Sequence, residues 1–256
     1  MDCKGAKLEL FRALPSRKRL MALGQPLRLA GLRAKGNRKF KATTDSNHAH
    51  PIAENLLHQR FQAARPNQVW LSDLTYIRTQ EGWLYLAAVL DLYTREIVAR
   101  GQPLGWALGA RMTLQLVIAA LRMAWFRKHP GKHMGLVFHS DRGSQYASLA
   151  FRKALKDYGM MQSMSGAGNC FDNSPRGSPR AMESFWHSLK VEDVHGRNFA
   201  TREDATHAIV IYIEAFYNCA RRHSSIGYLA PRQFEKQFYQ QQNLNQNNSV
   251  KQSTNT

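Results

Sequence analysis

Residues 67–95 have the sequence NQVWLSDLTYIRTQEGWLYLAAVLDLYTR. The first half alternates in the manner of a β-strand. One face would hold Val69, Leu71, Asp73, Thr75 and Ile77, and the other Trp70, Ser72, Leu74 and Tyr76. Glu81 and Gly82 predict a turn, and residues 83–93 are almost continuously apolar, which is typical of a strand covered on both faces. The stretch therefore predicts two consecutive strands of a buried sheet.

Strand and helix patterns alternate in the chain that follows. Residues 111–128 have apolar side chains at helical spacing, and residues 136–138 form a short apolar strand that leads to Asp141. Further helices are predicted over residues 149–158, from Met182, and after a capping box of Thr201 and Asp204. This order favours an α/β fold, a mixed central sheet flanked by helices.

The composition indicates a polyanionic partner. The 256 residues include 36 Lys and Arg against 18 Asp and Glu, a formal charge of +18. Such an excess repels itself and is explained by binding to nucleic acid, although a ribosome-associated or merely basic protein has the same signature. Three scattered cysteines exclude a disulfide framework, and the lack of a long apolar run excludes a membrane span. We expect a cytoplasmic protein.

The charge is concentrated at the start of the chain. Residues 1–41 hold 12 Lys and Arg against 2 Asp and Glu, so we divide off residues 1–42 as a basic N-terminal arm. Its candidate DNA-binding residues are Arg33, Lys35, Arg38, Lys39 and Lys41, although a solvated leader is an equal reading. Residues 43–66 are predicted as a linker, 67–239 as the core with C-terminal helices, and the Gln/Asn-rich residues 240–256 as a disordered tail.

Three carboxylates stand out from their surroundings. Asp73 lies on an apolar strand face, Asp141 follows a buried strand, and Glu183 begins a helix after a loop rich in Gly, Ser and Pro. Singly, each has an ordinary structural reading, as the partner of a core arginine, a turn residue or a helix N-terminal acid. Together, in a basic chain without a Cys or His cluster, they indicate a site for Mg²⁺ or Mn²⁺.

The helix from Met182 adds a second kind of group. Glu183, His187 and Lys190 share a polar stripe beside an apolar one, which places a cation near the candidate metal ligand. Lys190 is a candidate contact to the DNA backbone or an ordinary surface lysine, and His187 is expected to be a bystander.

Five motifs together resemble the catalytic subunit of IS3-family insertion-sequence transposases. They are residues 67–95, FHSDRGSQYAS (138–148), SMSGAGNCFDN (163–173), MESFWHSLKVE (182–192) and YNCARRHSSIGYLAP (217–231). The resemblance covers residues 43–235 and implies an RNase H-like integrase catalytic core, shared with retroviral integrases. It implies that Asp73, Asp141 and Glu183 are the catalytic DDE triad and hold two Mg²⁺ or Mn²⁺ ions. Lys190 matches a basic residue that contacts transposon-end DNA.

The resemblance also implies partners. Relatives of this kind are usually made as a fusion with an upstream helix-turn-helix subunit, of which residues 1–42 look like a remnant. It further implies DNA ends and target DNA as substrates, a homo-oligomer on DNA, and a bacterial, nucleoid-associated location.

The chain departs from the family pattern by three hexamers. The near-identical ALGQPL (22–27) and ARGQPL (99–104) interrupt familiar motifs, and the interval between Asp141 and Glu183 is about six residues longer than usual, near 176–181. We therefore keep two alternatives to an active transposase, namely an insertion-damaged relic that only binds DNA and an RNase H-type nuclease on the same fold. A break within the strands at 99–104 matters most, because a slip of one residue reverses the faces of a strand.

Overall fold

The computed structural model describes residues 48–58, 60–98, 106–132, 134–166 and 181–253. All of them lie in the second of the two units into which the chain divides, Thr43–Thr256. Within the described residues, no helix is both long enough and apolar enough to cross a membrane.

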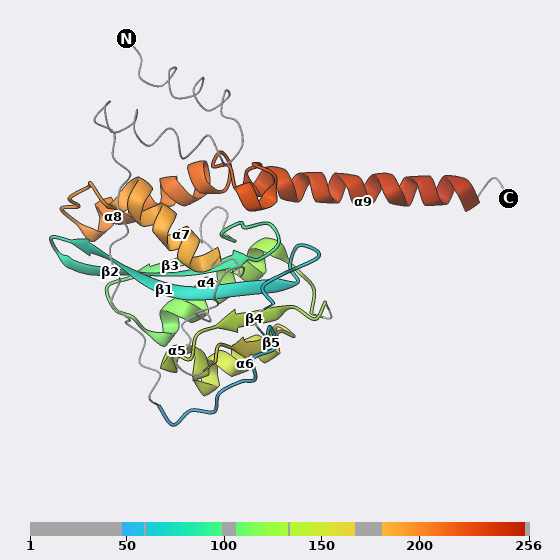
Figure 1. Cartoon of the computed structure of the whole chain (residues 1–256). Coiled ribbons are helices and arrows are strands. Elements are labelled where there is room, and N and C mark those ends of the chain that lie inside the picture. The colour runs from blue at the N-terminus through green and yellow to red at the C-terminus, as the bar shows by residue number, and fades with distance from the viewer. Residues whose placement is uncertain (1–47, 59, 99–105, 133, 167–180, 254–256) are drawn as a thin grey trace, which may run out of the picture. The chain divides into compact units, whose positions relative to one another are not determined.

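A five-stranded mixed sheet forms the centre of this unit (Figure 1). Its strands are β1 (Val69–Thr79), β2 (Gly82–Asp91), β3 (Trp106–Gly109), β4 (Val137–Ser140) and β5 (Met161–Met164). Their spatial order is β3-β2-β1-β4-β5, with β2 antiparallel to both β1 and β3 and with β4 parallel to both β1 and β5. The predicted mixed α/β architecture is confirmed.

The two long strands form the predicted hairpin-like pair. Thr79 pairs with Gly82, and the Thr79 hydroxyl donates to the Gly82 carbonyl over 2.8 Å, which closes a two-residue turn. Gly82 has a φ of +114°, a backbone conformation that side-chain-bearing residues rarely adopt. Strand β1 alternates between two cores, with Leu71 in one and Trp70 in the other. Both faces of the hairpin are therefore covered.

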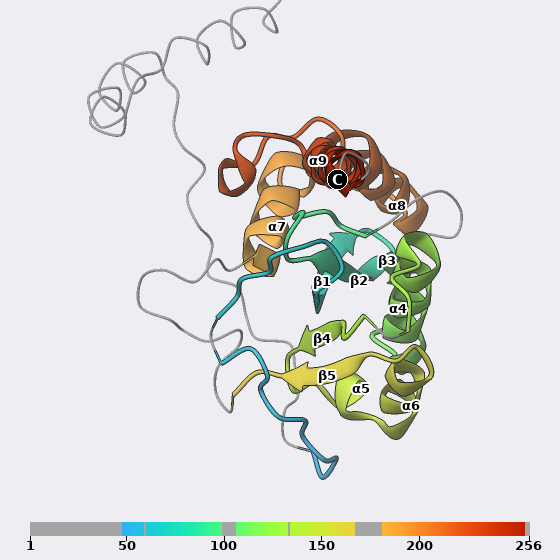
Figure 2. The same ribbon diagram turned by 90° about the vertical axis from the view of Figure 1, so that its right-hand side faces the viewer.

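Helices cover both faces of the sheet (Figure 2). The core that contains Trp70 packs against α4 (Leu114–Lys128), α5 (Ser144–Ala147) and α6 (Leu149–Asp157). The core that contains Leu71 packs against α7 (Ala181–Leu189), the π-helix η1 (Lys190–Val194), α8 (Arg202–Ile211) and the π-helix η2 (Tyr212–Tyr217). A short 3₁₀ helix η3 (Ser224–Ile226) precedes the long helix α9 (Pro231–Ser253). The predicted capping box at the start of α8 is present, with reciprocal bonds between Thr201 and Asp204.

The ladder with β2 continues on both sides of the hexamer at 99–104, which lies outside the described residues. Val98 donates from its backbone to the Val89 carbonyl, and Trp106 pairs with the next β2 residue, Ala88. Side-chain alternation also agrees, because Val98 and Ala107 belong to the core on the α4 side. Seven residues, 99–105, lie between these neighbouring rungs, one more than the hexamer, so Trp106 pairs one position away from where it would in a continuous strand without the hexamer.

Two segments differ from the domain boundaries predicted above. Residues 43–66 were predicted as a linker, yet in the described part of this segment Leu57 and Phe61 are buried in the core, and the Leu56 backbone donates to the hydroxyl of Ser163 in β5 over 2.9 Å. The predicted disordered tail is corrected for residues 240–253, which continue α9. Its first turns are held by packing on Tyr93, and glutamine is a good helix former, so the helix propagates from that base although residues 240–246 are exposed.

A buried ion-pair network joins α9 to α4. Glu96 is completely buried and accepts from Arg127 at 2.9 Å, Lys128 at 2.5 Å and Arg232 at 3.2 Å. Lys128 also pairs with Glu235 of α9 at 2.6 Å. These cations hold the pKa of Glu96 below its ordinary value although burial alone would raise it. The network therefore places a charged carboxylate inside the fold.

Candidate active site

Asp73 and Asp141 are brought together by the register of two parallel strands. The last paired residues of β1 and β4 are Leu71 and His139. Each aspartate follows its paired residue by two positions, and residues two apart on a strand share a face. Because β1 presents Leu71 to the core on the α7 side, the register carries both carboxylates to that side at the carboxyl end of β4. Ligand groups commonly occupy this edge of an α/β sheet.

Backbone amides fix the rotamers of both carboxylates. The Leu74 amide donates to Asp73 Oδ1 at 2.7 Å, and the Gly143 amide donates to Asp141 Oδ1 at 2.9 Å. Asp141 is buried and Asp73 is half-buried. Desolvation, followed by the negative charge of Asp141, raises the pKa of Asp73 to about 7. Two carboxylates within electrostatic range of each other and without full hydration form a site that favours a cation.

Helix α7 contacts this pair through a tryptophan. Trp186 Nε1 donates to Asp73 Oδ2 at 2.8 Å, and Trp186 is 8% exposed. Glu183 lies in the first turn of α7, three residues before Trp186, on the same side of the helix. Sequence reasoning overlooked Trp186, although its spacing from Glu183 was a usable signal because residues three apart on a helix are neighbours.

The three predicted carboxylates are only partly assembled. Within the described part of the chain, no group of three His, Cys, Asp or Glu side chains is close enough to hold one metal ion. Strand register brings Asp73 and Asp141 to the same edge of the sheet. Glu183 lies on α7, whose Trp186 contacts Asp73. His187, expected to be a bystander, is half-buried in the last turn of α7.

Lys190 lies inside this region. It is 8% exposed, and its Nζ is 5.2 Å from the centre of the Tyr76 ring. Burial lowers the pKa of Lys190, while the charge of Asp73 opposes that shift. The lysine is therefore a buried cation next to the first aspartate, and not the ordinary surface lysine of the alternative reading. The candidate DNA-binding residues of the arm lie outside the described residues: Arg33, Lys35, Arg38, Lys39 and Lys41.

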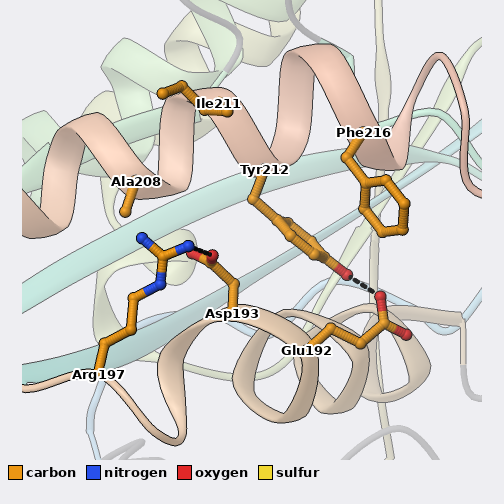
Figure 3. A pocket seen from close by; sticks show the side chains of 7 residues that line it. All are labelled: Glu192, Asp193, Arg197, Ala208, Ile211, Tyr212 and Phe216. Carbon is orange, nitrogen blue, oxygen red and sulfur yellow. Dashed lines mark hydrogen bonds and ion pairs between the residues drawn. The ribbon is translucent and has the colours of Figure 1, made fainter. Parts of the chain in front are cut away.

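A separate pocket of about 370 Å³ lies between η1, α8 and η2 (Figure 3). It is lined by Glu192, Asp193, Arg197, Ala208, Ile211, Tyr212 and Phe216. Its acids are engaged, because the Tyr212 hydroxyl donates to Glu192 at 2.8 Å and Arg197 pairs with Asp193 at 2.6 Å. The lining includes none of Asp73, Asp141 and Glu183, so this pocket is distinct from the candidate active site.

Comparisons with known proteins match the chain to integrase core domains. Two models described as integrase core domain match residues 63–170 and 183–239. The chain is 48% identical to an uncharacterized 31 kDa protein of insertion element IS600 from Shigella sonnei, over 88% of this chain and 76% of that protein. It is 47% identical to the transposase InsF for insertion sequence IS3A from Escherichia coli, over 82% of this chain and 68% of that protein.

The fold has a solved counterpart. A chain of the simian T-cell lymphotropic virus intasome is 16% identical, with a TM-score of 0.50 over 75% of this chain and 60% of that one. This likeness confirms the predicted RNase H-like integrase core. Together with the sequence relatives, it shows that the chain belongs to the IS3-family transposases and carries their integrase core domain.

Proposed function

We propose that this chain is a DNA transposase subunit that cuts strands at insertion-sequence ends and joins them to target DNA. The family is one of DDE-type polynucleotidyl transferases. The observation that carries the proposal is the pairing of Asp73 with Asp141, beside a helix that bears Glu183 and donates a hydrogen bond to Asp73. In the proposed reaction, water cuts one strand at the element end. The freed 3′-hydroxyl then attacks a second phosphodiester, whose 3′ oxygen leaves, with no covalent enzyme intermediate.

The residues present fit a pair of hard divalent cations. All three proposed ligands, Asp73, Asp141 and Glu183, are carboxylates, the donors that Mg²⁺ and Mn²⁺ prefer. A cation would offset both the desolvation and the repulsion by Asp141 that raise the pKa of Asp73. When bound, two such ions stabilise the attacking and the leaving oxygen of an in-line displacement. Glu183 would complete the site by a movement of the first turn of α7 toward the aspartates.

The surrounding residues have supporting roles in this proposal. The Leu74 and Gly143 amides keep the two aspartates in fixed rotamers. Lys190 supplies positive charge next to Asp73 and is proposed to meet the DNA backbone there. The basic arm binds phosphates, and an upstream helix-turn-helix subunit selects the end sequence. Copies of the chain assemble on DNA, in the cytoplasm at the bacterial nucleoid.

The test is a strand-cleavage and strand-transfer assay. The full chain is mixed with its helix-turn-helix subunit, labelled duplexes that carry the element end, and Mg²⁺. We expect cleaved and joined products from the unmodified chain and a loss of at least about 100-fold in rate from Asp73→Asn, Asp141→Asn or Glu183→Gln, since general-base and electrostatic groups contribute factors of that size. Glu203→Gln is the matched control, because Glu203 is an exposed acid in the first turn of α8.

Two alternatives are outcomes of the same assay. If the unmodified chain and Glu183→Gln give the same background while a version without the three hexamers is active, the chain is an insertion-damaged relic that only binds DNA. If an RNA–DNA hybrid is digested and element ends are not, the chain is an RNase H-type nuclease.

A further inference from the structure

Trp186 joins the two parts of the candidate active site that come from distant positions in the chain. Asp73 belongs to β1, and Glu183 belongs to α7. Trp186 also lies on α7, and its indole links this helix to β1 by the 2.8 Å bond to Asp73 Oδ2. The indole is held in place by its own packing, because its ring centre is 4.7 Å from that of Phe185 and the residue is 8% exposed. The donor is therefore presented by a rigid, buried side chain.

The hydrogen bond is compatible with a bound cation. Each carboxylate oxygen has two lone pairs. Asp73 Oδ1 accepts from Leu74 and Oδ2 accepts from Trp186, which leaves one lone pair on each oxygen for a metal. Groups that orient a ligand in this way are worth roughly 10–100-fold in metal affinity.

The same helix face continues toward Lys190. Trp186 and Lys190 are four residues apart, and both turn to β1, where Trp186 meets Asp73 and Lys190 lies over the Tyr76 ring. Glu183 lies three residues before Trp186 on this face. A shift or rotation of α7 that broke the bond from Trp186 to Asp73 would therefore also move Glu183, which the same helix carries.

We propose that Trp186 is a positioning residue of the transposase, which fixes the Asp73 carboxylate and ties to it the helix that carries Glu183. This inference rests on the proposed function, since it assigns to Trp186 the alignment of the proposed metal ligands. It makes no claim that Trp186 touches DNA or the reacting atoms.

The first experiment measures metal affinity in the full chain. Mn²⁺ is titrated into the unmodified protein, Trp186→Phe and Trp125→Phe, with Asp73→Asn as the reference that lacks a ligand. Phenylalanine keeps most of the packing and removes the N–H donor. Trp125 is the matched control, because it is 9% exposed and stacks on Tyr158 in the opposite core. We expect Trp186→Phe to raise the Mn²⁺ dissociation constant by about tenfold and Trp125→Phe to leave it unchanged.

The outcomes separate this inference from the proposed function. If Mn²⁺ binds the unmodified chain and Trp186→Phe equally well, and Asp73→Asn abolishes binding, the positioning role is refuted while the metal site stands. If Asp73→Asn binds Mn²⁺ as well as the unmodified chain does, the proposed metal site itself is refuted.

A second measurement does not depend on the folding of Trp186→Phe. The chain has five tryptophans, so ¹⁵N-labelled protein gives five indole N–H resonances. Substituting the other four tryptophans by phenylalanine, one at a time, assigns their resonances and leaves that of Trp186 by elimination. We expect Mg²⁺ to shift the Trp186 resonance of the unmodified chain and not that of Trp125. A Trp186 resonance that is unmoved by saturating Mg²⁺ would overturn the inference.

Discussion

The carboxyl groups of Asp73 and Asp141 repel each other just beyond the last pair of β1 and β4. We therefore expect Asp141→Asn to stabilise the metal-free protein, because it removes the like charge beside Asp73. A gain of about 1 kcal/mol corresponds to a rise of roughly 2–4 °C in Tm for a domain of this size. Thermal unfolding in EDTA measures it. In about 10 mM Mg²⁺ the unmodified chain should have the higher Tm of the two, because a ligand that binds the folded state raises its stability and Asp141→Asn lacks one of the proposed metal ligands. A variant that is less stable in EDTA contradicts the expectation.

The Glu96 network predicts a large loss of stability on removal of one charge. Glu96→Gln leaves Arg127 and Lys128 with less compensation in a site where the glutamate is completely buried. Breaking a buried ion pair in this way costs about 3–5 kcal/mol. Urea unfolding measures it. The control is Glu81→Gln, whose pair with Arg202 is exposed and 3.9 Å long, and which should cost less than about 1 kcal/mol. Equal losses in the two variants would show that burial does not set the energy.

The N-terminus of α8 depends on one hydroxyl. The Thr201 hydroxyl accepts from the Asp204 amide at 3.0 Å, and the Asp204 carboxylate accepts from the Thr201 amide. Thr201→Ala should lower the free energy of unfolding by about 1 kcal/mol, and Thr201→Ser should retain most of it, because serine caps as well as threonine. Chemical denaturation of the three proteins tests this. A serine variant as unstable as the alanine variant would assign the loss to the methyl group instead.

His223 predicts a pH dependence of stability. Burial and the positive charges of Arg221 and Arg95 lower the pKa of His223 to about 4, against weaker opposing effects of its bond with the Tyr217 backbone and of Glu192. Because the unfolded chain binds this proton below its ordinary pKa of about 6.5, the free energy of unfolding should fall as the pH is lowered from 6.5 towards 4. Because the ring is only partly buried, solvent screening reduces the effect, and the expected loss between pH 7.5 and 5 is about 1 kcal/mol.

Urea unfolding at both pH values measures the effect of His223. In His223→Gln, which has no titrating ring, the difference between the two pH values should shrink by that amount. A variant with the same pH dependence as the unmodified chain would exclude His223 as the source.

Sequence patterns predicted those strands and helices whose whole periodicity lies within one segment of the chain. The alternation around Asp73 and the helical spacing of 111–128 lie within single segments, so β1 and α4 follow from them. Strands β3 and β5 have four residues each, which is too short for a period to be distinguished. Composition predicted a disordered tail where α9 continues, because the packing of the first turns of α9 on Tyr93 is a tertiary effect that composition does not report.

The proposed members of the candidate site could be named from the sequence, but their geometry could not. The aspartates were recognisable from their apolar surroundings and from the family motifs, and strand register brings them together. The bond from Trp186 to Asp73 depends on how α7 packs on β1, which no spacing within either segment specifies. The burial of Lys190 has the same origin. The Glu96 network joins residues more than 100 positions apart, beyond the reach of any local pattern.

Val98 bonds to Val89 and Trp106 pairs with Ala88, which are neighbouring residues of β2. This arrangement has a practical use. Since the chain holds seven residues, 99–105, between these neighbouring rungs of one ladder, this position is a candidate insertion point for foreign sequence. A short epitope or a cysteine for a fluorophore placed there would tag the protein next to the rung that holds Asp73, two strands across the sheet from that carboxylate. Single molecules could then be followed by fluorescence.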